Sequence, residues 1–258
     1  GERGFDCNRV RQALVHLAPK LHRRPDPATQ YTFGPRISTI QASRTEDRFL
    51  ADNFEDAAEE GVFSNYTYLG LEAEYSFDNR DLKAMPTRGI HLELAASYEL
   101  SLDGPGESFP QLSGALTINQ KLDRRGNLVL ANRVGYAAVF TDNPAYFQAA
   151  TLGGVGTGKN FRGFRRERFS GQSAFFVNND LRWKLLSSQR RAVPFSFGIL
   201  AGYDLGRAWV DSENSNTWHY SYGGGFFISP FDLATIKISY FVGDGEIGRM
   251  IIGGGFFF

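Results

Sequence analysis

Apolar and polar residues alternate along most of the chain after residue 60, with the period of two that is typical of β-strands. The segment from Ile90 to Leu100 shows this most clearly, because every second residue is apolar and charged residues such as Glu93 lie between them. Alternation of this kind predicts strands with one apolar and one polar face. The nine predicted strands are Phe63–Phe77, Ile90–Leu100, Leu112–Leu122, Leu128–Phe140, Ala174–Leu186, Val193–Trp209, Trp218–Ser229, Leu233–Val242 and Met250–Phe258.

Residues 1–60 are less regular. Arg36–Ala42 predicts a tenth strand, and Thr45–Gly61 is typical of an acidic, exposed loop. Ala13–Leu21 is compatible with a strand or a helix, and we favour a strand because the proline-containing segment 23–29 would form a short turn into the next strand. Bacterial single-chain barrels have even strand numbers, so these eleven strands lead us to expect twelve in this chain, or sixteen if upstream strands are missing.

Strand length and the composition of the two faces favour a membrane barrel over a soluble sandwich. Many predicted strands are long enough to cross a membrane when tilted, which takes about 9–11 residues. Aromatic residues such as Tyr75, Tyr98 and Trp209 lie near the strand ends, where an aromatic girdle would be. The opposite faces carry charged side chains that a wet lumen can solvate and a dry core cannot. The predicted fold class is all-β, a transmembrane antiparallel up-and-down β-barrel.

Composition narrows the possible functions. The 28 basic and 28 acidic residues balance, so net charge gives no reason to expect a nucleic-acid partner. The single cysteine, Cys7, excludes an internal disulfide and a multi-cysteine zinc site, and the four histidines share no metal-ligand spacing. No Ser/His/Asp constellation stands out. We therefore expect no enzyme, no metal and no cofactor.

A glycine-rich segment at 153–169 partly matches a nucleotide-binding loop. Gly153, Gly158 and Lys159 fit the G-x-x-x-x-G-K pattern. Asn160 stands where a serine or threonine should bind magnesium, and the following residues show no apolar helical stripe. We therefore expect no nucleotide, and a different role for this segment.

Several segments resemble known outer-membrane proteins. The chain ends with IIGGGFFF at 251–258, which resembles the C-terminal targeting signal of bacterial outer-membrane barrels, with Gly253, Phe256 and Phe258 in place. Four further segments resemble the barrel of the BamA/TamA outer-membrane protein assembly family and occur in that family's order. They are YSFDNRD at 75–81 with PTRG at 86–89, FRGF at 161–164, YDLGRAW at 203–209, and GGGFFISP at 223–230.

The resemblance covers about residues 62–258 and implies an integral protein of the bacterial outer membrane that inserts or translocates other proteins. Its implied partners are outer-membrane lipids and lipopolysaccharide, and unfolded or partner outer-membrane proteins. Residues 1–60 would hold the first barrel strand or strands and the long acidic loop. Residues 61–258 would form the C-terminal part of the same barrel, with the extracellular loop 141–171 plugging the lumen.

Members of that family precede the barrel with periplasmic POTRA modules, and the segment 1–60 is too short to contain one. If none lies upstream, the chain is expected to be a barrel-only member. The alternative to insertion or translocation is then a structural anchor or partner subunit in an outer-membrane complex, or a narrow pore.

In the BamA/TamA family an R-G-F/Y segment folds back into the lumen, where acidic groups hold its arginine. The match falls on Arg162, Gly163 and Phe164. Alternation independently places Asp180 and Asp204 on the luminal faces of their strands, where they could bind a guanidinium group bidentately. We predict that Arg162 pairs with Asp180, Asp204 or both.

Two alternatives remain open at the level of sequence. The arginine-rich loop could be solvated or bound to lipopolysaccharide phosphates, a role that Arg165, Arg166 and Arg168 fit better than Arg162 does. In the last strand, Gly253–Gly255 could weaken pairing at a seam between the first and last strands of the barrel, or could make room for neighbouring aromatic rings.

Overall fold

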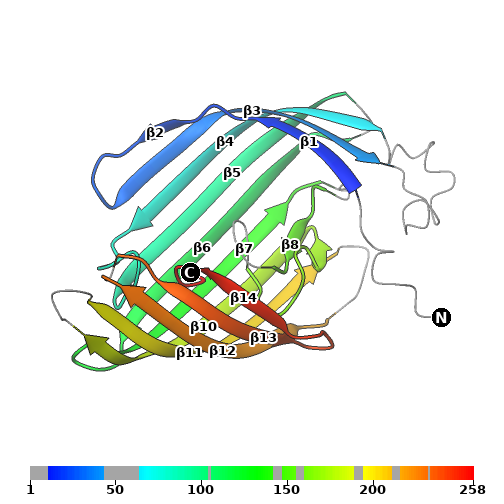
Figure 1. Cartoon of the computed structure of the whole chain (residues 1–258). Coiled ribbons are helices and arrows are strands. Elements are labelled where there is room, and N and C mark those ends of the chain that lie inside the picture. The colour runs from blue at the N-terminus through cyan, green and yellow to red at the C-terminus, as the bar shows by residue number, and fades with distance from the viewer. Residues whose placement is uncertain are drawn as a thin grey trace.

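The computed structural model is a strongly curved antiparallel sheet that wraps around a small hairpin on its concave side (Figure 1). It describes residues 11–43, 64–103, 106–141, 147–154, 160–188, 194–210, 216–231 and 233–258. The acidic loop expected at 45–61 lies outside these residues, as do Cys7, Gly158 and Lys159. The described residues contain no helix long and apolar enough to cross a membrane.

The main sheet contains 12 strands, which confirms the predicted number and fold class. Its order is β1-β3-β4-β5-β6-β7-β10-β11-β12-β13-β14, with β2 also paired to β3. The strands are β1 Arg11–Leu17, β2 Leu21–Arg23, β3 Thr29–Ser43, β4 Asn65–Asp78, β5 Gly89–Asp103, β6 Phe109–Lys121, β7 Leu128–Val139, β10 Ser173–Ser188, β11 Phe195–Trp209, β12 His219–Pro230, β13 Ile236–Gly243 and β14 Arg249–Gly254. The hairpin consists of β8 Ala150–Leu152 and β9 Phe169–Gly171.

Strands β1 and β2 lie end to end along the same side of β3. The ambiguous segment 13–21 is therefore extended, and the break between the two strands falls at Pro19, whose ring nitrogen cannot donate to a ladder. Gly34 of β3 accommodates the irregular backbone, because a Cβ there would lie 2.1 Å from the carbonyl oxygen of Pro19. Among the described residues, no ladder joins β1 to β14.

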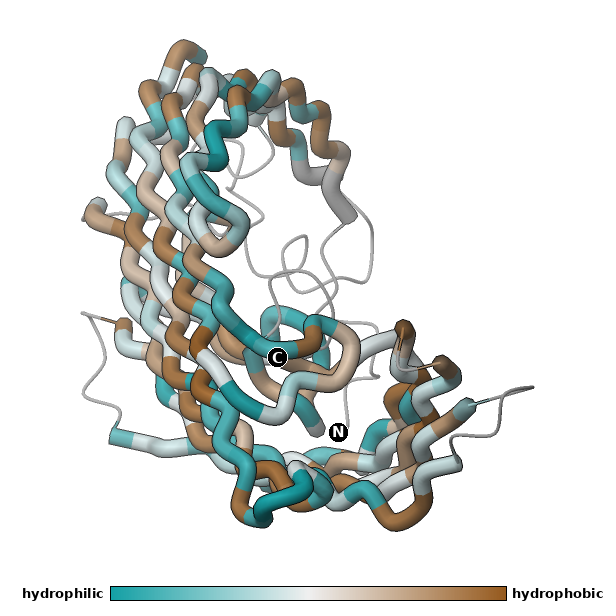
Figure 2. The backbone as a smooth tube through the Cα atoms, turned by 90° about the vertical axis from the view of Figure 1, so that its left-hand side faces the viewer, coloured by the Kyte–Doolittle hydropathy of each residue, from teal (hydrophilic) through white to brown (hydrophobic). Residues whose placement is uncertain are grey.

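The two faces of the sheet differ as the alternation predicted. Along β10, Asn178, Asp180 and Arg182 are buried on the concave face, whereas Leu181 and Trp183 are exposed on the convex face. Figure 2 shows the same alternation of hydrophilic and hydrophobic residues along neighbouring strands. An apolar convex face and a polar concave face are what a membrane barrel requires, because lipid covers one and water or protein fills the other.

The longest connection between strands of the main sheet marks one of its two ends. One end has the turns that join β4 to β5, β6 to β7 and β12 to β13, and the long connection between β7 and β10 lies at the other end. Outer-membrane barrels have short turns on the periplasmic side and long loops on the extracellular side. By this rule we expect the turns to lie at the periplasmic end and loop 141–171 at the extracellular end.

The last strand is shorter than predicted. The alternation suggested Met250–Phe258, but β14 ends at Gly254. Gly255 has a φ of 75°, a conformation that glycine adopts easily, and it turns the chain out of the sheet. Phe256 and Phe258 therefore do not continue the ladder.

The β4–β5 turn is organised by one carboxylate. Asp81 accepts hydrogen bonds from the backbone N–H groups of Leu82, Thr87 and Arg88 at 2.9–3.2 Å, and from the Thr87 hydroxyl at 2.6 Å. Partial burial acts to raise the pKa of Asp81, but these hydrogen bonds outweigh it and hold the pKa below its usual range. The turn is thus tied together by an ionised side chain.

Replacing Asp81 with alanine is expected to lower the free energy of unfolding by about 1–3 kcal/mol at neutral pH, because several donors lose their acceptor. A lowered carboxyl pKa stabilises the fold above the unfolded value of about 4, and this stabilisation is lost as the pH falls through the folded value. The urea midpoints of wild type and Asp81→Ala should therefore differ at pH 7 and converge below about pH 4. Lys83→Ala, at an exposed position of the same turn, should leave the midpoint unchanged. An equal difference at both pH values would contradict this role.

Candidate functional site

The described part of loop 141–171 folds back along the concave face of the sheet (Figure 1). Strands β8 and β9 pair with each other, and a bridge between Gly154 and Phe161 extends the hairpin. Gly153 and Gly154 have φ values of 124° and 94°, so both positions favour glycine. Residues 160–164, between β8 and β9 in the sequence, lie against β10, β11, β12 and β13.

Arg162 is the centre of this contact, with only 2% of its surface exposed. Its Nη1 donates to Asp180 Oδ1 at 2.5 Å, and its Nη2 donates to Asp204 Oδ1 at 2.5 Å. Its Nε and its backbone N–H both donate to Asp204 Oδ2 at 2.9 Å. The arginine therefore contacts both predicted carboxylates, one of them through two side-chain nitrogens and the main chain.

Neighbouring strands complete the surroundings of the guanidinium group. The Ser221 hydroxyl donates to Asp204 Oδ2 at 3.2 Å, and Arg182 Nη2 donates to Asp180 Oδ2 at 3.2 Å. The guanidinium carbon of Arg162 lies 4.2 Å from the centroid of the Phe241 ring. Gly202 leaves space for it, since a Cβ there would lie 2.8 Å from Nη2. Two buried arginines thus face two buried carboxylates, which balances the charge.

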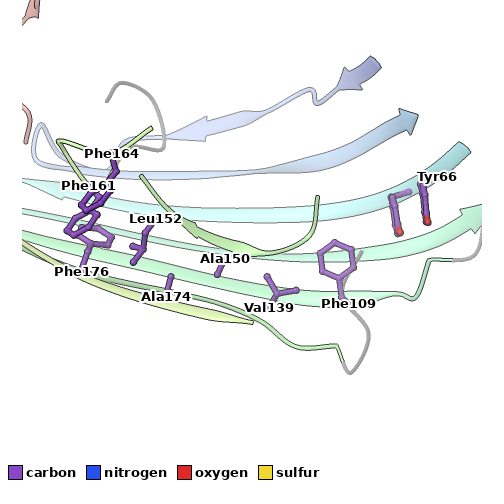
Figure 3. Packing of buried hydrophobic residues seen from close by; sticks show 10 residues of the cluster. Tyr66, Phe109, Val139, Ala150, Leu152, Phe161, Phe164, Ala174 and Phe176 are labelled. Carbon is purple, nitrogen blue, oxygen red and sulfur yellow. The ribbon is translucent and has the colours of Figure 1, made fainter. Parts of the chain in front are cut away.

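Gly163 and Phe164 follow the arginine into close contact with the wall. Gly163 has a φ of 80°, and a Cβ on it would lie 2.8 Å from the Gly243 nitrogen. Phe164 rests on Gly243 and stacks on Phe161 with the ring centroids 4.9 Å apart. Figure 3 shows these two rings beside Phe176 and Leu152 at one end of a buried apolar cluster.

A second contact holds the beginning of the loop. Phe147 packs edge-on against Tyr66 of β4 with ring centroids 5.0 Å apart, and Gln148 Nε2 donates to the Tyr68 hydroxyl at 3.0 Å. Phe109 of β6 closes this end of the apolar cluster (Figure 3). The loop is therefore attached to β4 as well as to β10–β13.

Sequence reasoning missed several residues of this site. Asn160, considered above only as a poor magnesium ligand, accepts a hydrogen bond from Gly153 N at 3.0 Å and donates to Thr151 O at 2.7 Å. Its own carbonyl accepts a hydrogen bond from Asn178 at 2.9 Å. Alternation places Asn178 and Arg182 on the same face as Asp180, which gives the inward direction of both but not their contacts at the site. Asn160 lies in a loop, where no periodicity applies.

No group of three or more histidine, cysteine or acidic side chains in the described ranges is arranged to hold a metal ion. The site is built from paired charges, hydrogen bonds and stacked rings. Such an arrangement can hold a loop against a wall, and it releases the loop only if buried charges are separated or moved together.

Comparison with known proteins identifies the family. The family described as haemolysin secretion/activation protein ShlB/FhaC/HecB matches residues 82–227. The chain belongs to this family. The expected relationship to BamA/TamA-like outer-membrane barrels and the outer-membrane location are thereby confirmed, and the family is a secretion class and not a class of enzymes.

Two solved structures show the same fold at low sequence identity. BamA from Haemophilus ducreyi lacking POTRA domains 1–3 superposes with a TM-score of 0.70 at 14% identity, over 95% of this chain and 55% of that one. CdiB from Escherichia coli gives a TM-score of 0.58 at 13% identity, over 94% of this chain and 44% of that one. The chain thus spans about half the length of each. No curated protein matches it significantly in a sequence search.

In this ShlB/FhaC/HecB family member, the terminal phenylalanines lie on the arginines of the site and not along the last strand. The guanidinium carbon of Arg182 lies 4.0 Å from the centroid of the Phe256 ring. The guanidinium carbon of Arg162 lies 4.9 Å from the centroid of the Phe257 ring. Arg182 Nη2 also donates to the main-chain oxygen of Phe258 at 3.0 Å. The end of the chain therefore contacts the residues that hold the loop.

Crowding does not explain the glycines at positions 253 and 255. Gly253 pairs with Lys237 in the ladder, and a Cβ added to it would have no neighbour within 4 Å. The same is true of Gly255. The alternative that these glycines make room for aromatic rings is therefore wrong at both positions. A role in weak strand pairing stays a prediction.

Proposed function

We propose that this chain is the barrel of an outer-membrane protein that translocates other proteins, and that loop 141–171 occupies its lumen in the resting state. Membership of a secretion family supports translocation rather than insertion. The observation that carries the resting state is the burial of Arg162 between Asp180 and Asp204, with side-chain exposures of 3%, 1% and 0%. We call these three residues the loop lock.

The loop crosses the space that a passing polypeptide needs. It contacts β4 through Phe147 and Gln148, and it contacts β10 and β11 through Arg162. Removing one partner of a buried ion pair costs about 3–5 kcal/mol, so the loop does not leave by thermal fraying alone. Passage of a substrate therefore requires the loop lock to open, or the loop and its wall to move together.

The wall beside the loop is suited to a polar chain. A cavity of about 490 Å³ remains between the hairpin and β4–β7, and it is lined by Glu74, Glu93 and Arg133 together with small residues such as Ser113 and Ala115. Polar and charged groups can exchange hydrogen bonds with an unfolded backbone that has no ladder of its own. This surface supports transit through the lumen.

Translocation is tested by comparing the proteins in the culture medium of cells that lack the full-length protein with those of cells that express wild type. We expect at least one protein to disappear from the medium without the barrel and to return with wild type. A fall in folded outer-membrane proteins, with the medium unchanged, would indicate insertion instead. A stable stoichiometric partner in pull-downs, with neither effect, would indicate an anchor.

A further inference from the structure

A second contact between distant parts of the sheet lies at its other end, where β4 turns into β5 and β12 into β13. The β4–β5 turn lies against the β12–β13 turn, although β6, β7, β10 and β11 separate these strand pairs in the sheet (Figure 1). The Thr235 hydroxyl donates to the carbonyl oxygen of Ala84 at 2.7 Å, between positions 151 residues apart. The turn therefore reaches across the concave side of the curved sheet and contacts a distant part of it.

Apolar packing of Met85 strengthens the contact between the two turns. Met85 is 8% exposed and packs in an apolar cluster with Leu200, Phe227 and Phe241, next to Phe256. Burial against these inward-facing side chains places Met85 on the concave side of the sheet. Leu82, three positions earlier in the same turn, is 45% exposed.

The turn is linked to the loop lock by continuous contacts. Phe256 packs edge-on against Phe227 at 5.1 Å and lies under Arg182 at 4.0 Å. Arg182 donates to Asp180, which in turn accepts from Arg162. Movement of Met85 away from Phe256 would remove part of the packing that holds Arg182 against Asp180.

We propose that residues 79–88 form a periplasmic lid, which closes the lumen below the loop lock and must swing away when a polypeptide enters from the periplasm. The lid is held by a neutral hydrogen bond and by packing of Met85 and Pro86, whereas opening the lock would separate buried charges. It is therefore the weaker of the two closures and opens first. That an entering polypeptide must displace this turn rests on the proposed translocation. That the turn closes the lumen at rest does not.

The closure is tested by labelling a single luminal cysteine in the folded full-length protein. Ser239 lies on the inner face of β13 at 4% exposure, and Ser239→Cys with Cys7→Ser provides the reporter. Met85→Ser should raise the labelling rate by a bulky maleimide roughly tenfold, because a buried apolar side chain is lost. Thr235→Val should raise it about fivefold through loss of one hydrogen bond.

Leu82→Ser is the matched control, since it makes the same kind of change at an exposed position of the same turn. The heat-dependent shift of the folded barrel in gel electrophoresis verifies that every variant is folded. If Met85→Ser and Leu82→Ser are labelled by the maleimide at the same rate, residues 79–88 do not form a lid.

A second experiment separates the lid from the proposed function. The pair Ala84→Cys and Thr235→Cys, with Cys7→Ser, should form a disulfide in the folded protein and reduce release of the secreted protein until a reductant is added. Failure of the pair to cross-link would overturn the lid. Accelerated labelling of Met85→Ser with normal release from the cross-linked protein would support the lid and count against translocation through the lumen.

Discussion

Replacing Asp204 with alanine is expected to release the loop from the wall and to lower backbone protection around residues 160–164 by a factor of several hundred. Asp204 accepts hydrogen bonds from three nitrogens of Arg162 and from the Ser221 hydroxyl, and it is fully buried. Its loss leaves the guanidinium group buried with Asp180 alone. Breaking a buried pair in this way costs about 3–5 kcal/mol. Hydrogen exchange followed by mass spectrometry measures the effect on the folded barrel.

Two comparisons make this prediction specific. In a double-mutant cycle, Arg162→Ala with Asp204→Ala should cost less than the sum of the single changes by about 1.5–3 kcal/mol, because the two side chains act as a unit. Glu246→Ala removes another ion pair between loop and barrel, at 2.6 Å from Arg168, whose side chain is 49% exposed. An exposed pair contributes about 0–1 kcal/mol, so this control should leave protection almost unchanged. Equal effects of Glu246→Ala and Asp204→Ala would contradict the loop lock.

Arg162→Lys tests the geometry separately from the charge. A lysine keeps the positive charge but cannot present several nitrogens in one plane to two carboxylates. We expect its loop protection to lie much closer to that of Arg162→Ala than to that of wild type. Recovery of wild-type protection by lysine would mean that charge alone holds the loop.

Alternation of residues was enough to predict the sheet and the inward direction of Asp180 and Asp204, because side-chain direction in a strand has a strict period of two. It could not place the break at Pro19, since β1 and β2 pair with the same strand and the break shows only in three dimensions. It also extended the last strand to Phe258, although the conformation of Gly255 ends it. In a sequence, apolar residues that leave the sheet and enter the lumen cannot be distinguished from a continued strand.

Contacts between distant turns and loops could not be predicted from the sequence, for a different reason. Asn160 stabilises the hairpin through backbone groups of Gly153 and Thr151, and any residue type could have supplied the carbonyl that Asn178 binds. Met85 reaches the β12–β13 side only because the sheet curves. The family resemblance pointed to Arg162, and alternation supplied its partners, but curvature brought them together.

Replacing Gly163 with alanine is expected to release the loop almost as completely as Asp204→Ala, for a steric reason. Two costs combine at this position. A φ of 80° disfavours any residue with a Cβ, by about 1–2 kcal/mol. The added Cβ would also lie 2.8 Å from the Gly243 nitrogen and 2.9 Å from the Val242 carbonyl carbon, in backbone that β12 and β13 hold in a ladder.

Gly245→Ala separates these two costs. Gly245 has a φ of 70°, but a Cβ added there would have no neighbour within 4 Å. This control should therefore carry only the conformational cost of about 1–2 kcal/mol, in a turn that does not contact the lock. Hydrogen exchange of residues 160–164 should increase strongly in Gly163→Ala and remain unchanged in Gly245→Ala. If both variants keep wild-type protection, Gly163 is not pressed against β12 and β13 in the resting state, and the loop lies farther from the wall than Arg162 requires.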